Sequence, residues 1–241
     1  LQSGYTALRQ RRGGGVPLKK ILSYLIFLVC IPLVIALGMA VLGDRQYAFA
    51  AAAVAVLSCI PFFISFEKGE NNTTRLVIIA VMVALSVIGR LVFYYVPGFK
   101  PVTAMVVITA IYFGAEAGFM TGALTALISN FFFGQGMWTP FQMLAWGLIG
   151  FAAGLLAKKL ISSKVLLCTY GAVSGIAYSL LLDLFGVIWA DTYFNLSRYI
   201  AMVVSSAPFT ILYAASNVIF LLVLQKPLGK KLERVKDKYG I

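Results

Sequence analysis

Residues 75–96 read RLVIIAVMVALSVIGRLVFYYV, an apolar run with a single internal charge, Arg90. A helix of about 20 apolar residues spans the hydrocarbon core of a bilayer, so this run predicts a transmembrane helix. The whole chain has the same character, since 61% of its 241 residues are hydrophobic and only 12% are charged. Soluble domains carry about 25% charged residues. The sequence therefore predicts an all-α integral membrane protein.

Further apolar runs lie on both sides of this stretch and are separated by charges, glycines or prolines. They cover residues 21–43, 46–66, 101–115, 117–133, 139–157, 164–188 and 199–225. Residues 101–133 fit either two short helices broken near Glu116–Gly118 or one re-entrant segment. A single helix over them would be about 50 Å long, too long for one crossing, so two helices fit better. We therefore expect eight membrane helices.

The polar loop at 67–74 divides the chain into two parts. The runs before it are aliphatic, whereas those after it carry more glycine, serine, threonine, asparagine and aromatic residues. We predict a basic tail at 1–20, two extra N-terminal transmembrane helices at 21–66, a six-helix substrate-binding core at 75–225 and a basic tail at 226–241.

The distribution of positive charge predicts the orientation. The net charge is +12, and most lysines and arginines lie in the two tails and in the loops around 67–75 and 158–164. The alternate loops hold only Arg45, Lys100 and Arg198. Cytoplasmic loops of membrane proteins are enriched in lysine and arginine, so both termini are expected in the cytoplasm. The basic excess then contacts anionic lipid headgroups and not nucleic acid.

The side-chain inventory argues against an enzyme. The chain has no histidine, which excludes histidine-based triads and metal sites. Its three cysteines (Cys30, Cys59 and Cys168) are far apart and predict small buried hydrophobes. Its eight acidic residues are scattered, and no Walker A sequence is present. We expect no catalytic residue, no metal site and no cofactor.

Three loops of the expected core lie on one membrane face: 94–101, 130–142 and 183–198. Their rings and amides predict a pocket for a bulky, mostly neutral ligand, with rings for stacking and amides for orientation. The candidate substrate-binding residues are Tyr94, Tyr95, Asn130, Gln135, Trp138, Gln142, Trp146, Asp183, Trp189 and Asn195. An interfacial aromatic belt explains Tyr94, Tyr95 and Trp189 equally well.

Asp183 has a second interpretation. A carboxylate within the membrane is a functional candidate by default, and it could couple ion movement in a stand-alone secondary transporter. It could also form a salt bridge with Arg90 or Arg198. Both alternatives stay open from the sequence.

Small residues mark candidate contact faces. Ala80 and Ala84 are four residues apart, so they share one helix face where another helix can approach closely. Gly147, Gly150 and Gly154 form a similar stripe, for which we expect packing inside the bundle.

Together these features resemble the S component, the substrate-binding subunit, of an energy-coupling factor (ECF) vitamin transporter. The resemblance covers roughly residues 72–226. It rests on Gly114–Phe119, Gly122–Leu124, Ser129–Gly136, Trp138–Met143 and Trp146–Gly147, together with the alanine pair.

The resemblance implies a prokaryotic cell-membrane protein that captures a vitamin outside the cell. Ala80 and Ala84 would dock on a transmembrane coupling subunit, two ATPase subunits would hydrolyse ATP, and the chain would topple to release its cargo. Among the cargoes of such proteins, the cobalamin type is the closest resemblance. Another vitamin such as riboflavin is the alternative.

Overall fold

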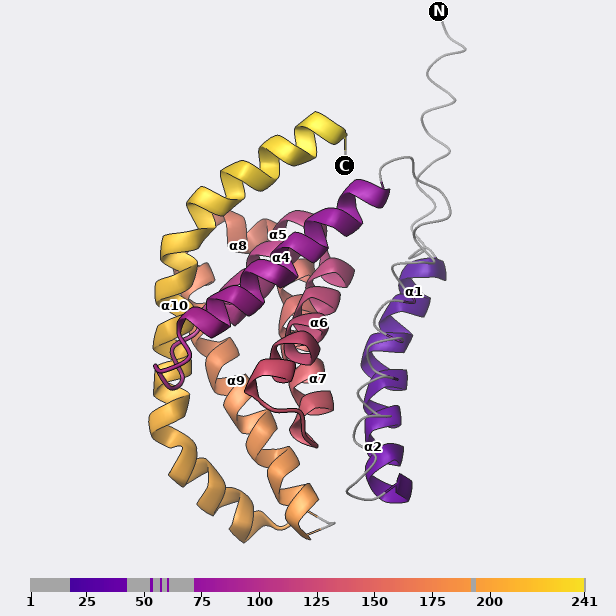
Figure 1. The fold of residues 1–241 in the computed structure, drawn as a ribbon, viewed down its shortest axis with the longest axis vertical. Helices are drawn as coiled ribbons and strands as arrows, with labels where there is room; N and C mark the ends of the chain where they lie inside the picture. The colour runs from indigo at the N-terminus through magenta and orange to yellow at the C-terminus, as the bar shows by residue number, and fades with distance from the viewer. Residues whose placement is uncertain are drawn as a thin grey trace, which may run out of the picture.

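The computed structural model describes residues 18–42, 53, 57, 60, 72–191 and 194–240. Within these ranges all regular secondary structure is helical (Figure 1). The basic tail up to residue 17 and most of the expected helix at 46–66 lie outside the described residues. Within the described ranges, the predicted all-α fold is confirmed.

The N-terminal segment forms one helical rod beside the core (Figure 1). It consists of α1 (Leu18–Leu25), a π-helical turn η1 (Ile26–Cys30) and α2 (Ile31–Leu42). The Phe27 ring stacks on Phe119 of the core with centroids 4.1 Å apart, and Tyr24 meets Phe151 edge-on at 5.1 Å. A helical segment therefore lies where the first extra helix was expected, and aromatic packing holds it against the core. That it crosses the membrane stays a prediction.

Six long helices form the core, as the sequence predicts. They are α4 (Asn72–Val92), α5 (Val102–Phe113), α6 (Ala115–Phe133), α7 (Trp138–Leu155), α9 (Lys164–Asp191) and α10 (Leu196–Tyr239). A short helix, α8 (Ala157–Ser162), joins α7 to α9. Two boundaries differ from expectation: α4 takes in the end of the polar loop at 67–74, and α10 continues through most of the expected tail at 226–241.

The central helix is α5. All of its residues are buried, and it contacts α4, α6, α7 and α10. A helix that is apolar all round is stable only when it is surrounded, which explains the even apolar character of residues 102–113. The chain reverses at Gly114, whose φ of +92° favours glycine. Two helices therefore replace the re-entrant alternative, and the break lies at Gly114, just before the expected position.

Glycines allow the closest helix contacts. A Cβ at Gly122 of α6 would lie 2.5 Å from the backbone of Trp146 in α7, and one at Gly147 would lie 2.9 Å from the Phe119 ring. A Cβ at Gly175 of α9 would lie 2.6 Å from the backbone of Ala214 in α10. These contacts agree with the packing role expected for the glycine stripe, and they set the spacing of the helices that frame the site.

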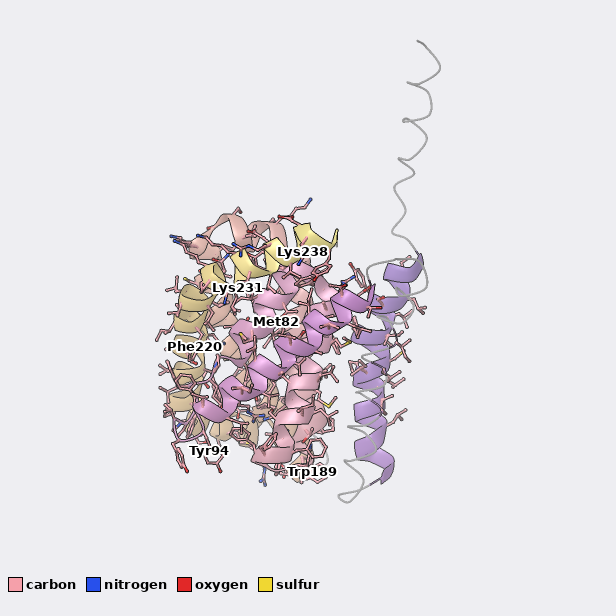
Figure 2. The ribbon with its side chains drawn as sticks, turned by 45° about the horizontal axis from the view of Figure 1, so that its top comes forward. Met82, Tyr94, Trp189, Phe220, Lys231 and Lys238 are labelled. Carbon is pink, nitrogen blue, oxygen red and sulfur yellow. The ribbon has the colours of Figure 1, made fainter. Side chains whose placement is uncertain are left out.

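The two ends of the bundle differ in charge. Lys231 and Lys238 lie at one end, while Tyr94 and Trp189 lie at the other (Figure 2). We call the end with the connections 93–101 and 134–137 and the start of α10 the loop face, and the opposite end the basic face. Among the described residues, α4, α9 and α10 are each long and apolar enough to cross a membrane.

Candidate functional site

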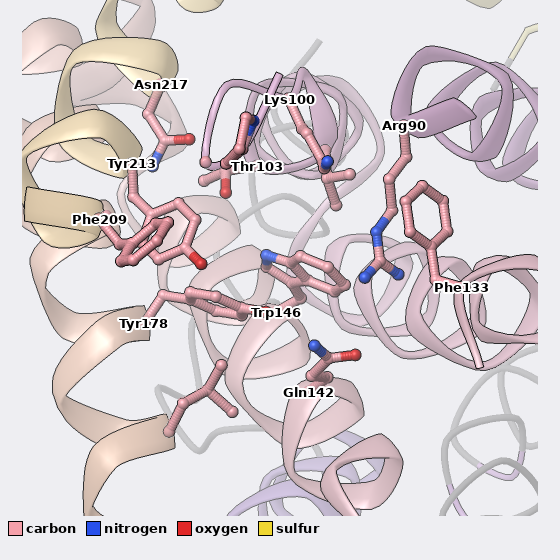
Figure 3. A pocket seen from close by; sticks show the side chains of 15 residues that line it. Arg90, Lys100, Thr103, Phe133, Gln142, Trp146, Tyr178, Phe209, Tyr213 and Asn217 are labelled. Atoms are coloured by element: carbon pink, nitrogen blue, oxygen red, sulfur yellow. The ribbon is translucent and has the colours of Figure 1, made fainter. Parts of the chain in front are cut away.

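A cavity of about 260 Å³ lies among the core helices near the loop face (Figure 3). Helices α4, α5, α6, α7, α9 and α10 and the connection between α4 and α5 all contribute to its wall. The lining residues are Arg90, Pro97, Gly98, Lys100, Val102, Thr103, Phe133, Gln142, Trp146, Gly175, Tyr178, Leu182, Phe209, Tyr213 and Asn217. The cavity thus combines several aromatic rings with a few polar groups, as small-molecule sites do.

Aromatic rings form one wall. Trp146 of α7 stacks on Tyr178 of α9 with centroids 5.0 Å apart and planes 13° apart. Tyr213 of α10 meets Tyr178 edge-on at 5.4 Å. Because the three rings come from three helices, their packing fixes one another's orientation. Such a wall suits a flat, conjugated ligand.

Arg90 lies beside Trp146, at the end of the cavity away from Tyr178 and Tyr213 (Figure 3), and its guanidinium is 5.2 Å from the Trp146 ring centroid. It belongs to the last turn of α4, where the helix dipole favours a cation. Its side chain is buried, donates to the Asn130 Oδ1 atom at 2.8 Å and donates to the Ser129 hydroxyl. The guanidinium also lies 4.3 Å from the centroid of Phe133. These contacts hold a buried cation in a single position.

Lys100 is the second cation of the cavity, and it follows the turn that ends α4. Its backbone N–H donates to the Ser216 hydroxyl at 2.9 Å, which ties this connection to α10. Its ammonium lies 3.4 Å from the Phe93 carbonyl oxygen and 5.2 Å from the Phe133 ring centroid. Burial, and secondly the charge of Arg90, lower the pKa of Lys100 below its ordinary value.

A hydrogen-bond network behind the cavity orients Arg90 and Gln142. The Asn130 amide accepts from Arg90 and donates to Gln142 Oε1 at 2.8 Å and to the Thr139 hydroxyl at 3.0 Å. The Thr139 hydroxyl also donates to Gln135 Oε1 at 2.9 Å. A buried polar network of this kind is rigid because each lost partner leaves a costly unpaired group.

The comparison with protein families decides the identity. A family model described as the S component of ECF-type riboflavin transporters matches residues 70–234, more than half of the chain. The chain belongs to this family. No curated protein and no solved structure matches it significantly.

Membership confirms the predicted ECF S component and implies that it works with a coupling subunit, ATPase subunits and a vitamin ligand. The description of the family names riboflavin, and the cobalamin type receives no support from it. Among the described residues of this S component, no group of acidic and cysteine side chains is arranged to hold a metal ion.

The structure distributes the candidate residues over several places. Gln142 and Trp146 line the cavity, whereas Asn130 and Gln135 belong to the network behind it. Trp138 and Trp189 line a separate apolar cavity of about 180 Å³ between α7 and α9.

The other candidates lie outside both cavities. Tyr95 is 91% exposed and Tyr94 is 50% exposed at the loop face, which agrees with the aromatic-belt interpretation. The Asp183 carboxylate accepts from the Ser206 hydroxyl of α10 at 2.6 Å. Asn195 caps α10 by accepting from the backbone N–H of Arg198. The salt bridge of Arg198 is formed with Asp191 and not with Asp183.

Several cavity residues were not among the candidates from the sequence, notably Tyr178, Tyr213 and Asn217. They lie within α9 and α10, where the sequence pattern does not tell a cavity-facing ring from a packed one. Asn217 carried a usable signal, because an amide inside an apolar span needs a partner. That partner is the carbonyl oxygen of Gly171, at 3.1 Å.

A second surface lies on the other side of α4. Ala80 and Ala84 are exposed and line an apolar groove of about 410 Å³ between α4 and α6. The remaining lining residues are Val83, Val87, Ile88, Leu91, Leu124, Ile128 and Phe132. Phe119 and Phe151, which the described N-terminal rod contacts, are not among the residues that line the groove.

Proposed function

We propose that this S component captures riboflavin, or a close flavin derivative, in the cavity at the loop face and delivers it to an ATP-driven coupling complex. The observation that carries the proposal is the cavity itself. It combines stacked aromatic rings with fixed hydrogen-bond donors, in a chain whose family is described by riboflavin transport. The flavin ring is flat and carries carbonyl and imide groups, so it can use both.

The size of the cavity supports a flavin over a corrinoid. Drug-sized ligands occupy pockets of roughly 300–1,000 Å³. The cavity of about 260 Å³ lies just below this range, so it is closer in size to a three-ring flavin than to a corrinoid. Cobalamin, with its macrocycle and nucleotide loop, is several times larger than the cavity.

The charges support an orientation with the cavity outside the cell. The basic face carries Lys158, Lys159 and Lys164 near α8, together with the lysines at the end of α10, while the loop face carries few cations. Because cytoplasmic segments are enriched in lysine and arginine, the basic face and both termini lie in the cytoplasm.

The groove at Ala80 and Ala84 is the proposed docking surface for the coupling subunit. Small residues let a partner helix approach the backbone of α4, and the apolar groove offers packing area within the membrane. ATP hydrolysis by the partner subunits then drives the toppling that releases the cargo inward.

A binding titration tests the proposed cargo. The purified chain is titrated with riboflavin and with cobalamin, by quenching of flavin fluorescence and by calorimetry. Saturable binding of riboflavin at one site, without binding of cobalamin, is expected. Cobalamin binding without riboflavin binding would overturn the proposal. The Trp138→Ala variant is the control, because Trp138 lies outside the main cavity.

A further inference from the structure

The cavity carries two positive charges and no negative one. Arg90 and Lys100 both line it, and no aspartate or glutamate is among the lining residues that the structure describes. The salt bridge found within the described ranges joins Arg198 to Asp191, away from the cavity. The site is therefore cationic, although the sequence analysis expected a mostly neutral ligand.

The carboxylates of Asp183 and Glu116 are not part of the cavity wall. Asp183 is bonded to Ser206 and does not line the cavity, and Glu116 lies in the first turn of α6, toward the basic face. A buried charge is costly unless it has a partner, and two like charges near each other add to that cost. Burial, and secondly the charge of Arg90, lower the pKa of Lys100.

Arg90 is also incompletely bonded. Only 8% of the residue is exposed, its Nη1 atom donates to Ser129 and Asn130, and its buried Nε atom has no hydrogen-bond partner among the described residues. Arg90 and Lys100 both lie against the ring of Phe133, at 4.3 Å and 5.2 Å from its centroid. Two cations thus converge on one end of the cavity.

The opposite end is aromatic and uncharged. Tyr178, Phe209 and Tyr213 lie there, with Trp146 between the two ends (Figure 3). This arrangement matches a ligand with a flat ring at one end and an anionic group at the other. Arginine and lysine together favour a phosphate, whose oxygens accept several charge-assisted hydrogen bonds.

We propose that the cavity binds the phosphate monoester of a flavin, riboflavin 5′-phosphate, in preference to uncharged riboflavin. The phosphate lies between Arg90 and Lys100, and the ring lies against Trp146 and Tyr178. This inference rests on the proposed function, because it assigns the charge of the same flavin cargo.

The test compares the two flavins on the same protein. Riboflavin 5′-phosphate and riboflavin are titrated against the purified chain at neutral pH, at low and at high salt. The phosphate form is expected to bind at least about tenfold more tightly, with a preference that shrinks as salt screens the charges.

Variants that remove one charge test which side chain causes the preference for riboflavin 5′-phosphate over riboflavin. Lys100→Gln is expected to reduce the affinity ratio by about tenfold, since it removes one charge-assisted partner of the phosphate. Arg198→Gln removes an equal charge from the loop face outside the cavity. The ratio of its affinities for the two flavins is expected to equal that of the wild type. Lys100 is chosen over Arg90 because Arg90 also holds α4 to α6 through Ser129 and Asn130.

Each other outcome counts against the inference. Equal or tighter binding of riboflavin, with a ratio that Lys100→Gln leaves unchanged, overturns the phosphate preference and keeps the flavin function. Binding of neither flavin overturns the proposed function as well.

Discussion

The cavity and the groove share helix α4 but differ in nearly every physical property. The cavity at Arg90 is enclosed by six helices and combines cations, amides and stacked rings. The groove at Ala80 and Ala84 is apolar, and its described lining residues belong to α4 and α6. The difference agrees with the two roles proposed for α4, whose end would contact the cargo and whose middle would contact the coupling subunit.

Filling the groove is the change with the largest expected effect on transport. The double variant Ala80→Trp/Ala84→Trp is expected to reduce ATP-dependent uptake to the level without the coupling subunit, because the bulky rings keep the partner helix away. Cargo affinity in the isolated chain is expected to stay that of the wild type.

The matched control for the groove is Leu85→Trp, on the same helix but outside the groove. Its uptake is expected to remain close to that of the wild type. Wild-type uptake by the alanine double variant would show that docking takes place elsewhere.

Removing the central ring of the cavity gives the next largest effect. Trp146→Ala is expected to weaken flavin binding by roughly 10- to 100-fold, about 1.4–2.8 kcal/mol, as for a buried aromatic anchor. Fluorescence titration measures the loss. Trp138→Ala, in the neighbouring apolar cavity, is the comparison, and an equal loss there would place the ligand between α7 and α9.

Asn130 tests the network that joins α4, α6 and α7. Asn130→Ala leaves Arg90 and Gln142 without a shared partner, at a cost of about 1–3 kcal/mol, so both Tm and flavin affinity are expected to fall. Asn195→Ala removes only a helix cap, so it is expected to lower Tm and to leave flavin affinity unchanged. If Asn130→Ala lowers Tm without affecting affinity, the network has no role in the cavity.

The smallest effect is expected at Asp183. Asp183→Asn keeps an acceptor for Ser206, so uptake should stay within about twofold of the wild type. Uptake in the reconstituted complex checks this. Complete loss of uptake in the variant, together with wild-type uptake that needs no ATP, would favour the ion-coupled carrier that the sequence left open.

The sequence predicts the core helices because a membrane restricts which backbone structures are stable. Every backbone group in the hydrocarbon must be bonded within its own helix, so apolar runs translate directly into spans. The turn between α5 and α6 was expected near Glu116–Gly118 but lies at Gly114, where a positive φ is accessible. Such boundaries depend on backbone conformation, to which hydropathy is insensitive.

Residues of the cavity could be predicted from the sequence only where they lie in or next to a loop that is rich in amides and rings. Gln142 and Trp146 follow an amide-rich and aromatic loop and line the cavity. Tyr178 and Tyr213 could not be found in the same way, because their role depends on how α9 and α10 pack. Tyr95 is the reverse case, since it lies in a loop at the face of the cavity but is 91% exposed and is not among the lining residues.

The most direct test of the account is uptake of radiolabelled cargo by proteoliposomes that contain the chain, a coupling subunit and the ATPase subunits. The account predicts that riboflavin or its phosphate accumulates only when both the coupling module and ATP are present, and that cobalamin does not accumulate. Accumulation of cobalamin, or of a flavin without the module and ATP, would contradict it.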